Sequence, residues 1–236
     1  GVEPRLRAPA VASVPNIQCA FALTTRLGVA TRMNIHSANL VEPAMALSDR
    51  KQEKREAILG AALRCFAERG FHGTTVPTIA EDAEVGAGTI YRYFENKEAL
   101  VNALFKAWKT AITEALTSDF PWTAPPREQF HVFWSRAVQF GVDNPEAVQF
   151  LEAHHHASFL DEESKAIEDN IMVMARTWLE MTAHTQATKD MPAEVLALMI
   201  WGMVVAVVRG GWEGRYSVTP KLIELTESVA WEAVRR

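Results

Sequence analysis

The chain has 236 residues and a mass of 26.3 kDa, and 48% of its residues are hydrophobic while 22% are charged. That apolar fraction is typical of a folded protein and excludes a largely disordered chain. The net charge of −5 argues against a surface that is basic all over for nucleic acid, although a small basic surface on an acidic body stays possible. Two cysteines are too few for the disulfide framework of a small secreted protein.

The most apolar stretch, residues 195–208, is shorter than the roughly 18 apolar residues that cross a membrane. Cys65 lies in an apolar helical pattern, where a buried free thiol is expected. The sequence therefore predicts a cytoplasmic protein without a membrane partner.

Residues 1–47 differ from the rest, because they hold four prolines and few charges and show no sustained helical period. Polar residues interrupt 17–30, so this segment does not fit a secretory signal. Two explanations are open. The segment is either an N-terminal arm that packs on the body or contacts a partner, or translation starts at Met33 or Met45 and the upstream residues are not native.

From Ser48 onward the pattern is helical. Apolar residues recur at helical spacing over 56–66, and Gly70 fits a left-handed C-terminal cap. Two short helices are expected next, over 76–83 and 89–94.

Side chains and prolines mark where the other helices begin. Thr74 and Thr75 can cap the first of the short helices, and Asn96 can cap a longer one to about residue 116. Beyond a proline-rich break, further helices are expected over 127–142, 146–159, 161–185, 193–208 and 220–236. Strand-like alternation is absent from the pattern, so the predicted fold is all-α.

Three short helices with a tight middle turn are the layout of a helix-turn-helix DNA reader. Residues 84–87 would form that turn, and the apolar side chains around it would hold the two helices at a fixed angle. The outward side chains of the third helix supply hydroxyls, a guanidinium and aromatic rings, which suit phosphates and base edges.

The residues Thr-Thr-Val-Pro-Thr-Ile-Ala at 74–80, Val-Gly-Ala-Gly-Thr-Ile-Tyr-Arg-Tyr-Phe at 85–94 and Asn-Lys-Glu-Ala-Leu at 96–100 follow one another in order. Over about 54–104 the sequence resembles the N-terminal domain of TetR-type transcriptional repressors. This resemblance implies an N-terminal three-helix DNA-binding domain, with its motif at about 75–94, and a C-terminal helical domain for effector binding and dimerisation.

By this resemblance, several residues are expected to contact double-stranded operator DNA. They are Thr75, Ala87, Thr89, Tyr91, Arg92, Tyr93 and Lys97. Tyr91 could instead lie partly in the core, and Lys97 could be an ordinary charge at a helix start. Two residues depart from the family pattern: Glu84 stands where glycine is usual in the turn, and Gly86 stands where serine often caps the reading helix.

Charge divides the chain into three parts. Residues 1–47 have a net charge of +2, residues 48–110 a net charge of +1, and residues 111–236 a net charge of −8. We therefore expect a near-neutral DNA-binding domain over 48–110 and an acidic ligand-binding and dimerisation domain over 111–236.

The helix expected over 193–208 is apolar on nearly all sides and needs to be covered all round. A second subunit explains this better than a monomer core does. By the family resemblance, the last two helices would form the homodimer. A single DNA-binding domain is expected to bind weakly, and pairing two of them would raise the affinity for DNA.

Tryptophan and methionine are frequent in the C-terminal part and can line a plastic apolar pocket. For any one of them, simple core filling is the alternative. The residues expected to line a pocket for a small apolar or aromatic effector are Trp108, Phe133, Trp134, Met174, Trp178 and Trp201. A constitutive DNA-binding protein without small-molecule control is the alternative function.

The run His154, His155 and His156 invites a metal hypothesis, but consecutive helical residues point about 100° apart and cannot converge on one ion. No Ser-His-Asp order, nucleotide-binding loop or zinc-protease motif is found in the sequence, so the protein is not expected to be an enzyme. We expect no metal, no cofactor and no catalytic residue.

Overall fold

The computed structural model describes residues 38–155 and 157–236, with side chains from residue 50 onward. Within these residues the only β-feature is an isolated bridge between Thr188 and Arg235. The prediction of an all-α fold is confirmed. The helices are α2 (Ala38–Gly73), α3 (Val76–Asp82), α4 (Ala87–Tyr91), α5 (Lys97–Thr117), α6 (Pro126–Asp143), α7 (Pro145–His154), α8 (Glu162–His184), α9 (Ala193–Trp212) and α10 (Pro220–Val234).

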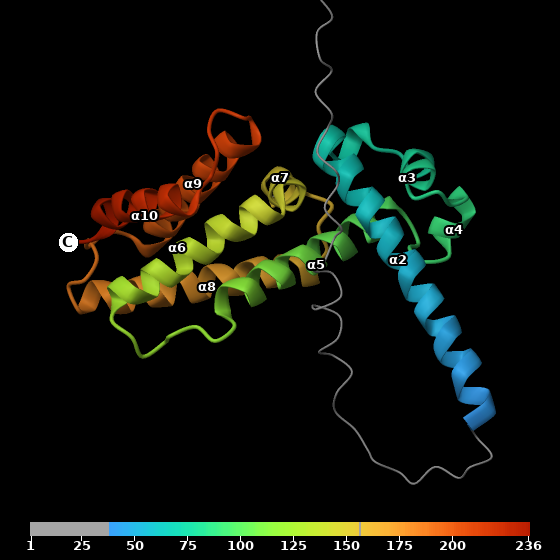
Figure 1. The fold of residues 1–236 in the computed structure, drawn as a ribbon, viewed down its shortest axis with the longest axis horizontal. Helices are drawn as coiled ribbons and strands as arrows, with labels where there is room; N and C mark the ends of the chain where they lie inside the picture. Colours follow the sequence, from blue (N-terminus) through green and yellow to red (C-terminus); the bar gives the residue numbers. More distant parts are fainter. Residues whose placement is uncertain (1–37, 156) are drawn as a thin grey trace, which may run out of the picture.

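Two parts make up the molecule (Figure 1). Helices α2, α3 and α4 form a head at one end, and α6, α8, α9 and α10 form a helical body at the other. Helix α5 runs from the head into the body, where it packs on α6 and α8, while α7 packs on α2. The predicted boundary at residue 110 therefore falls inside one continuous helix, so the two parts share a rigid element.

The core consists of two apolar clusters. One begins around Phe66 and Ile79 in the head and continues through Phe105 of α5 to Phe150 of α7. The second cluster lies between α6, α8, α9 and α10 and includes Trp134. Burial of each such large side chain stabilises the fold by about 2–3 kcal/mol. Because the first cluster crosses from head to body, the two parts are held together by apolar packing.

The long first helix corrects the prediction that helical structure begins at Ser48. Helix α2 begins ten residues earlier, at Ala38. Pro43 favours a break, but its neighbours in this segment include alanine, leucine and methionine, which are strong helix formers. Pro43 removes one backbone hydrogen bond in the second turn of α2, and the helix continues through it.

Helix α7 is shorter than predicted, because it ends at His154 and not at Phe159. The chain turns away there, and the ring of Phe159 stacks on that of Phe71 with the two centroids 3.9 Å apart. Tertiary packing against the head thus overrides the local helical pattern.

Helix α9 is longer than predicted, because it continues through Gly210 and Gly211 to Trp212. These glycines do not end the helix. Because they have no side chain, Tyr216 and Val218 can pack directly against the backbone of α9. A Cβ at Gly210 would lie 2.2 Å from Oη of Tyr216, and one at Gly211 would lie 2.6 Å from a methyl carbon of Val218. The chain after the helix therefore folds back tightly along it.

Candidate nucleic-acid interface

The head presents α3 and α4 as a helix-turn-helix unit. Ile79 of α3 and Ile90 of α4 are fully buried and fix the two helices against α2. In the turn between them, the backbone N–H of Val85 donates to the carbonyl of Ala80 at 2.9 Å. Glu84 has a φ of +54°, the left-handed conformation that explains why glycine is usual there.

Both caps of this unit match the sequence expectation. The hydroxyl of Thr75 accepts a hydrogen bond from the N–H of Thr78 at the start of α3. Gly86 is the N-cap of α4 and offers no side-chain bond, so α4 has the weaker cap. The two threonines differ in role, because the buried Thr74 hydroxyl lies 2.9 Å from the Cys65 carbonyl and 2.8 Å from the Gly70 carbonyl and closes the end of α2.

The reading helix differs from the predicted 89–94, since α4 spans Ala87–Tyr91 and the next two residues form a turn. Tyr91 is 54% exposed, so its ring lies outside the core of the described head. Arg92 is exposed as well, and Ala87 and Thr89 are half-buried. Tyr93 is half-buried against the head core, which leaves its outer edge accessible.

Lys97 begins α5 and is half-buried. Its Nζ donates hydrogen bonds to the carbonyls of Phe71 at 2.9 Å and Thr74 at 3.0 Å, and lies 4.0 Å from the centroid of the Phe71 ring. Two of its three N–H groups are thus used to hold the end of α2 to the start of α5.

A buried asparagine that the sequence pattern did not single out joins α5 to the start of α8. Asn102 of α5 is 4% exposed, and its Nδ2 donates to the carbonyls of Glu98 and Phe159, each at 2.8 Å. Its Oδ1 accepts from the N–H of Asp161 at 2.8 Å and from the hydroxyl of Ser164 at 2.9 Å. The signal in the sequence is an amide at an apolar position of a helix.

Matches to known proteins cover both parts of the molecule. Residues 58–104 match the family described as bacterial regulatory proteins, tetR family, and residues 105–236 match a tetracyclin repressor-like C-terminal domain.

The chain belongs to the TetR family.

Its relatives include regulators that this chain matches along nearly their whole length. An HTH-type transcriptional regulator of Haemophilus influenzae is 24% identical over 79% of this chain and 98% of its own. A TetR family transcription regulator of Marinobacter aquaeolei has a similar structure, with a TM-score of 0.71, 26% identity, and coverage of 79% of this chain and 98% of its own. The fatty acid metabolism regulator protein of Bacillus subtilis is 36% identical over 86 residues, which are 36% of this chain and 44% of its own.

TetR-family membership makes this protein a DNA-binding transcription regulator, and the family is one of regulators and not of enzymes. Helix α9 is long enough and apolar enough to cross a membrane, judged by its length and composition alone. Core helices of soluble proteins pass the same test, and α9 packs against α6 and α8 in the body of this TetR-family fold.

The six residues expected to line a pocket lie on the four helices α5, α6, α8 and α9, and two of them are core residues. Trp134 is 1% exposed, stacks on Phe130 and donates from its indole to the Thr226 hydroxyl at 3.3 Å. Trp108 is 7% exposed and lies edge-on to Phe140.

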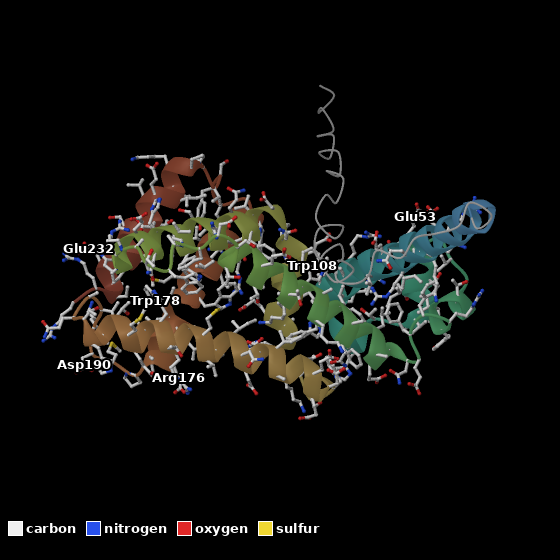
Figure 2. The ribbon with its side chains drawn as sticks, turned by 90° about the horizontal axis from the view of Figure 1, so that it is seen from below. Glu53, Trp108, Arg176, Trp178, Asp190 and Glu232 are labelled. Carbon is white, nitrogen blue, oxygen red and sulfur yellow. The ribbon has the colours of Figure 1, made fainter. Side chains whose placement is uncertain are left out.

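The other four, Phe133, Met174, Trp178 and Trp201, are half-buried. The indole of Trp178 donates to Gln129 of α6, and that of Trp201 donates to Glu152 of α7 at 2.7 Å. Trp201 packs against both apolar clusters. Figure 2 shows Trp178 on α8 and Trp108 on α5.

The histidine run is divided between two environments. His154 is buried among Phe66, Phe150 and Phe159, and its Nδ1 donates to the Phe150 carbonyl at 2.6 Å. His155 is exposed beyond the end of α7, and His156 lies outside the described residues. Among the residues that the structure describes, no three metal-binding side chains are grouped.

Proposed function

We propose that this protein is a homodimeric repressor in the cytoplasm that binds a palindromic operator and releases it when a small apolar or aromatic effector binds. Helix α4 would enter the major groove, with Ala87 and Arg92 facing base edges and Tyr91 packing at the groove wall. Thr75 and Lys97 would contact the DNA backbone, and Thr89 and Tyr93 would reach phosphates or base edges. The exposure of Tyr91 and Arg92 beside the buried Ile90 supports this assignment.

The apolar faces of the last two helices support the homodimer. On α9 the exposed residues Val195, Leu198 and Met199 lie on one face, and Leu198 is 63% exposed. On α10 Leu225 and Val229 are 53% and 69% exposed and lie one turn apart. Apolar side chains grouped in this way mark interaction surfaces, and a second copy would cover both helices.

The inward face of α8 supports the effector pocket and carries this part of the proposal. Between the buried Ser164 and Leu179, every side chain on that face is half-buried, although α8 packs along α5 and α9. These half-buried residues are Ile167, Glu168, Ile171, Met172, Met174, Ala175 and Trp178. A helix that leaves its mainly apolar inward face incompletely covered suits a ligand of the same character.

The name of the Bacillus subtilis relative concerns fatty acid metabolism, and an apolar effector fits that name. Such an effector would separate α8 from α5, and Asn102 would transmit the movement to the head. Helix α5 would then swing the two heads out of register with successive major grooves.

The experiment is a release screen. An operator duplex is selected from a random pool with the full chain, and compounds with apolar chains or aromatic rings are added to the complex. We expect at least one compound to lower operator affinity tenfold or more at micromolar concentration. If operator affinity stayed constant for every compound that binds the protein, control by an effector would be refuted in favour of constitutive DNA binding.

A further inference from the structure

Helix α2 extends well beyond the head. The matched regulatory domain begins at residue 58, whereas α2 begins at Ala38. At 1.5 Å per residue, this overhang adds about 30 Å of helix. Figure 1 shows it as the blue end of α2, which projects past α3 and α4. The overhang therefore lies at the end of the molecule that carries the DNA-reading helix.

The part of the overhang next to the head is strongly basic. Four of the six residues from 50 to 55 are basic and one, Glu53, is acidic. The side chains of Arg50, Lys51 and Lys54 are exposed, and Arg55 is half-buried.

The basic side chains share one face of α2. At 100° per residue, positions 50, 51, 54 and 55 fall within an arc of about 140°. The buried residues Ile58 and Ala62 lie on the continuation of that arc, so the basic face points to the side of α2 that packs on the rest of the head. Glu53 lies on the opposite side, and Figure 2 shows it pointing away from the other head helices.

A contact with the chain after α4 fixes the position of this face. The guanidinium carbon of Arg55 lies 5.5 Å from the centroid of the Phe94 ring, three residues beyond the end of α4. The basic face thus begins beside the end of the reading helix and continues outward from it.

The head itself supplies little positive charge. Residues 56–98 contain four basic and seven acidic residues, a net charge of −3. Arg64 pairs with Asp82 at 2.7 Å and Arg69 with Glu68 at 3.2 Å, and Lys97 is bonded to backbone carbonyls. Arg92 is exposed, and it alone of these four cations is left to face DNA without such a bond within the described part of the chain.

We propose that the basic face of the α2 overhang is a second DNA-binding surface, which contacts backbone phosphates that flank the bases read by α4. DNA binding draws most of its affinity from neutralised phosphates, and a head with a net charge of −3 cannot supply that attraction by itself. Arg50, Lys51 and Lys54 supply it next to the groove. These contacts carry no base information, so they strengthen binding to operator and unrelated duplex alike.

The test compares the full chain with a triple variant, Arg50→Gln, Lys51→Gln and Lys54→Gln, by fluorescence anisotropy over a range of salt concentrations. The probes are an operator duplex selected from a random pool and an unrelated duplex of equal length. We expect the triple variant to bind both at least tenfold more weakly. The slope of log affinity against log salt should fall by about 0.9 for each phosphate that the variant no longer neutralises.

The matched control is Lys165→Gln, Arg215→Gln and Lys221→Gln, which removes three exposed cations from the body. We expect wild-type affinity and salt slope from it. Equal losses in both triple variants would overturn the proposal in favour of a general charge effect, and so would an unchanged slope in the overhang variant. The unrelated duplex separates this outcome from a failure of operator recognition or effector control, because neither affects binding to it.

A measurement on the wild-type protein removes any dependence on how the variant folds. Operator duplexes are shortened one base pair at a time from both ends. We expect affinity to fall while base pairs outside the selected sequence are being removed. Constant affinity down to the selected sequence itself would contradict a flanking phosphate surface.

Discussion

Nδ2 of Asn102 donates a hydrogen bond to the carbonyl of Phe159 at 2.8 Å and so joins α5 to the segment between α7 and α8. The same amide also holds Asp161 and Ser164 at the start of α8. One buried side chain therefore fixes the position of the helix that carries the head relative to the helix proposed to line the effector pocket.

Removing this amide should destabilise the protein. The change Asn102→Ala leaves buried backbone and hydroxyl groups without partners, and we expect the free energy of unfolding to fall by about 3 kcal/mol. Chemical denaturation followed by circular dichroism measures it. The control Asn170→Ala, at an exposed position of α8, should change the free energy by no more than about 0.5 kcal/mol. Equal values for the two variants would show that the Asn102 network contributes nothing.

The turn of the helix-turn-helix should gain stability from glycine. Glu84 has a φ of +54°, which costs a residue with a Cβ about 1 kcal/mol. We expect Glu84→Gly to raise the free energy of unfolding by up to that amount. Glu81→Gly, inside α3, should lower it by about 1 kcal/mol. A loss of stability in Glu84→Gly would refute strain at this position.

Arg92 and Tyr91 should matter for operator binding and not for folding. Both are exposed, so Arg92→Ala and Tyr91→Ala should leave the melting temperature unchanged. We expect Arg92→Ala to weaken operator binding about tenfold or more, since a good base contact is worth about 1–3 kcal/mol. Tyr91→Ala should weaken it as well, because packing at the groove wall is lost. Binding to unrelated duplex should change less. Wild-type operator affinity in both variants would contradict the proposed role of α4.

Thr89 and Tyr93 complete the test of the reading helix. Tyr93 packs against the head core, so the variant that spares its packing is Tyr93→Phe combined with Thr89→Ala. We expect weaker operator binding and an unchanged dimer.

His154 should make stability depend on pH. Burial lowers the pKa of His154 below its ordinary value near 6.5, and the hydrogen bond to the Phe150 carbonyl offsets only part of that shift. Below pH 6.5 the unfolded chain therefore binds a proton at this histidine that the native state does not bind. The free energy of unfolding falls as the pH falls. We expect His154→Gln to lose part of this dependence between pH 7.5 and 5. The exposed His184→Gln should keep it, and parallel curves for wild type and His154→Gln would contradict the assignment.

The dimer should depend on the exposed apolar residues of α9 and α10. We expect Leu198→Glu or Val229→Glu to give monomers in sedimentation velocity, because a carboxylate would be buried without a partner. Val173→Glu, on α8 and 48% exposed, changes a similar side chain off this surface and should remain dimeric. If the wild-type protein sedimented as a monomer at micromolar concentration, the dimer proposal would be wrong.

The order of the helices could be predicted from the sequence because the signals are local. Thr75, Asn96 and Asp161 stand in the sequence as capping residues or helix starts, and each caps a helix in the structure. The predicted helix ends were wrong where packing against residues distant in the sequence determines the end of the helix. Phe159 leaves the helical pattern to stack on Phe71, and Gly210 stays helical because Tyr216 lies against it.

The DNA-reading part of the candidate site could be predicted from the sequence more fully than the proposed effector pocket, again because its signals are local. A reading helix has a short motif of fixed spacing, so the residues around Ile90 could be named from the sequence. The body carries no such motif, and aromatic residues there cannot be divided into core and lining from composition. Trp134 is a core residue, whereas Trp178 lies on the incompletely covered face of α8. Asn102 was missed because three of its four partners are brought to it only by the tertiary fold.

The most direct test of a dimeric operator-binding repressor is selection of bound duplexes from a random pool by the full chain, followed by the mass of the complex. We predict an inverted repeat with two half-sites about one helical turn or a multiple apart, bound by an even number of subunits. Enriched sequences without two-fold symmetry, or a single subunit on the selected duplex, would contradict it.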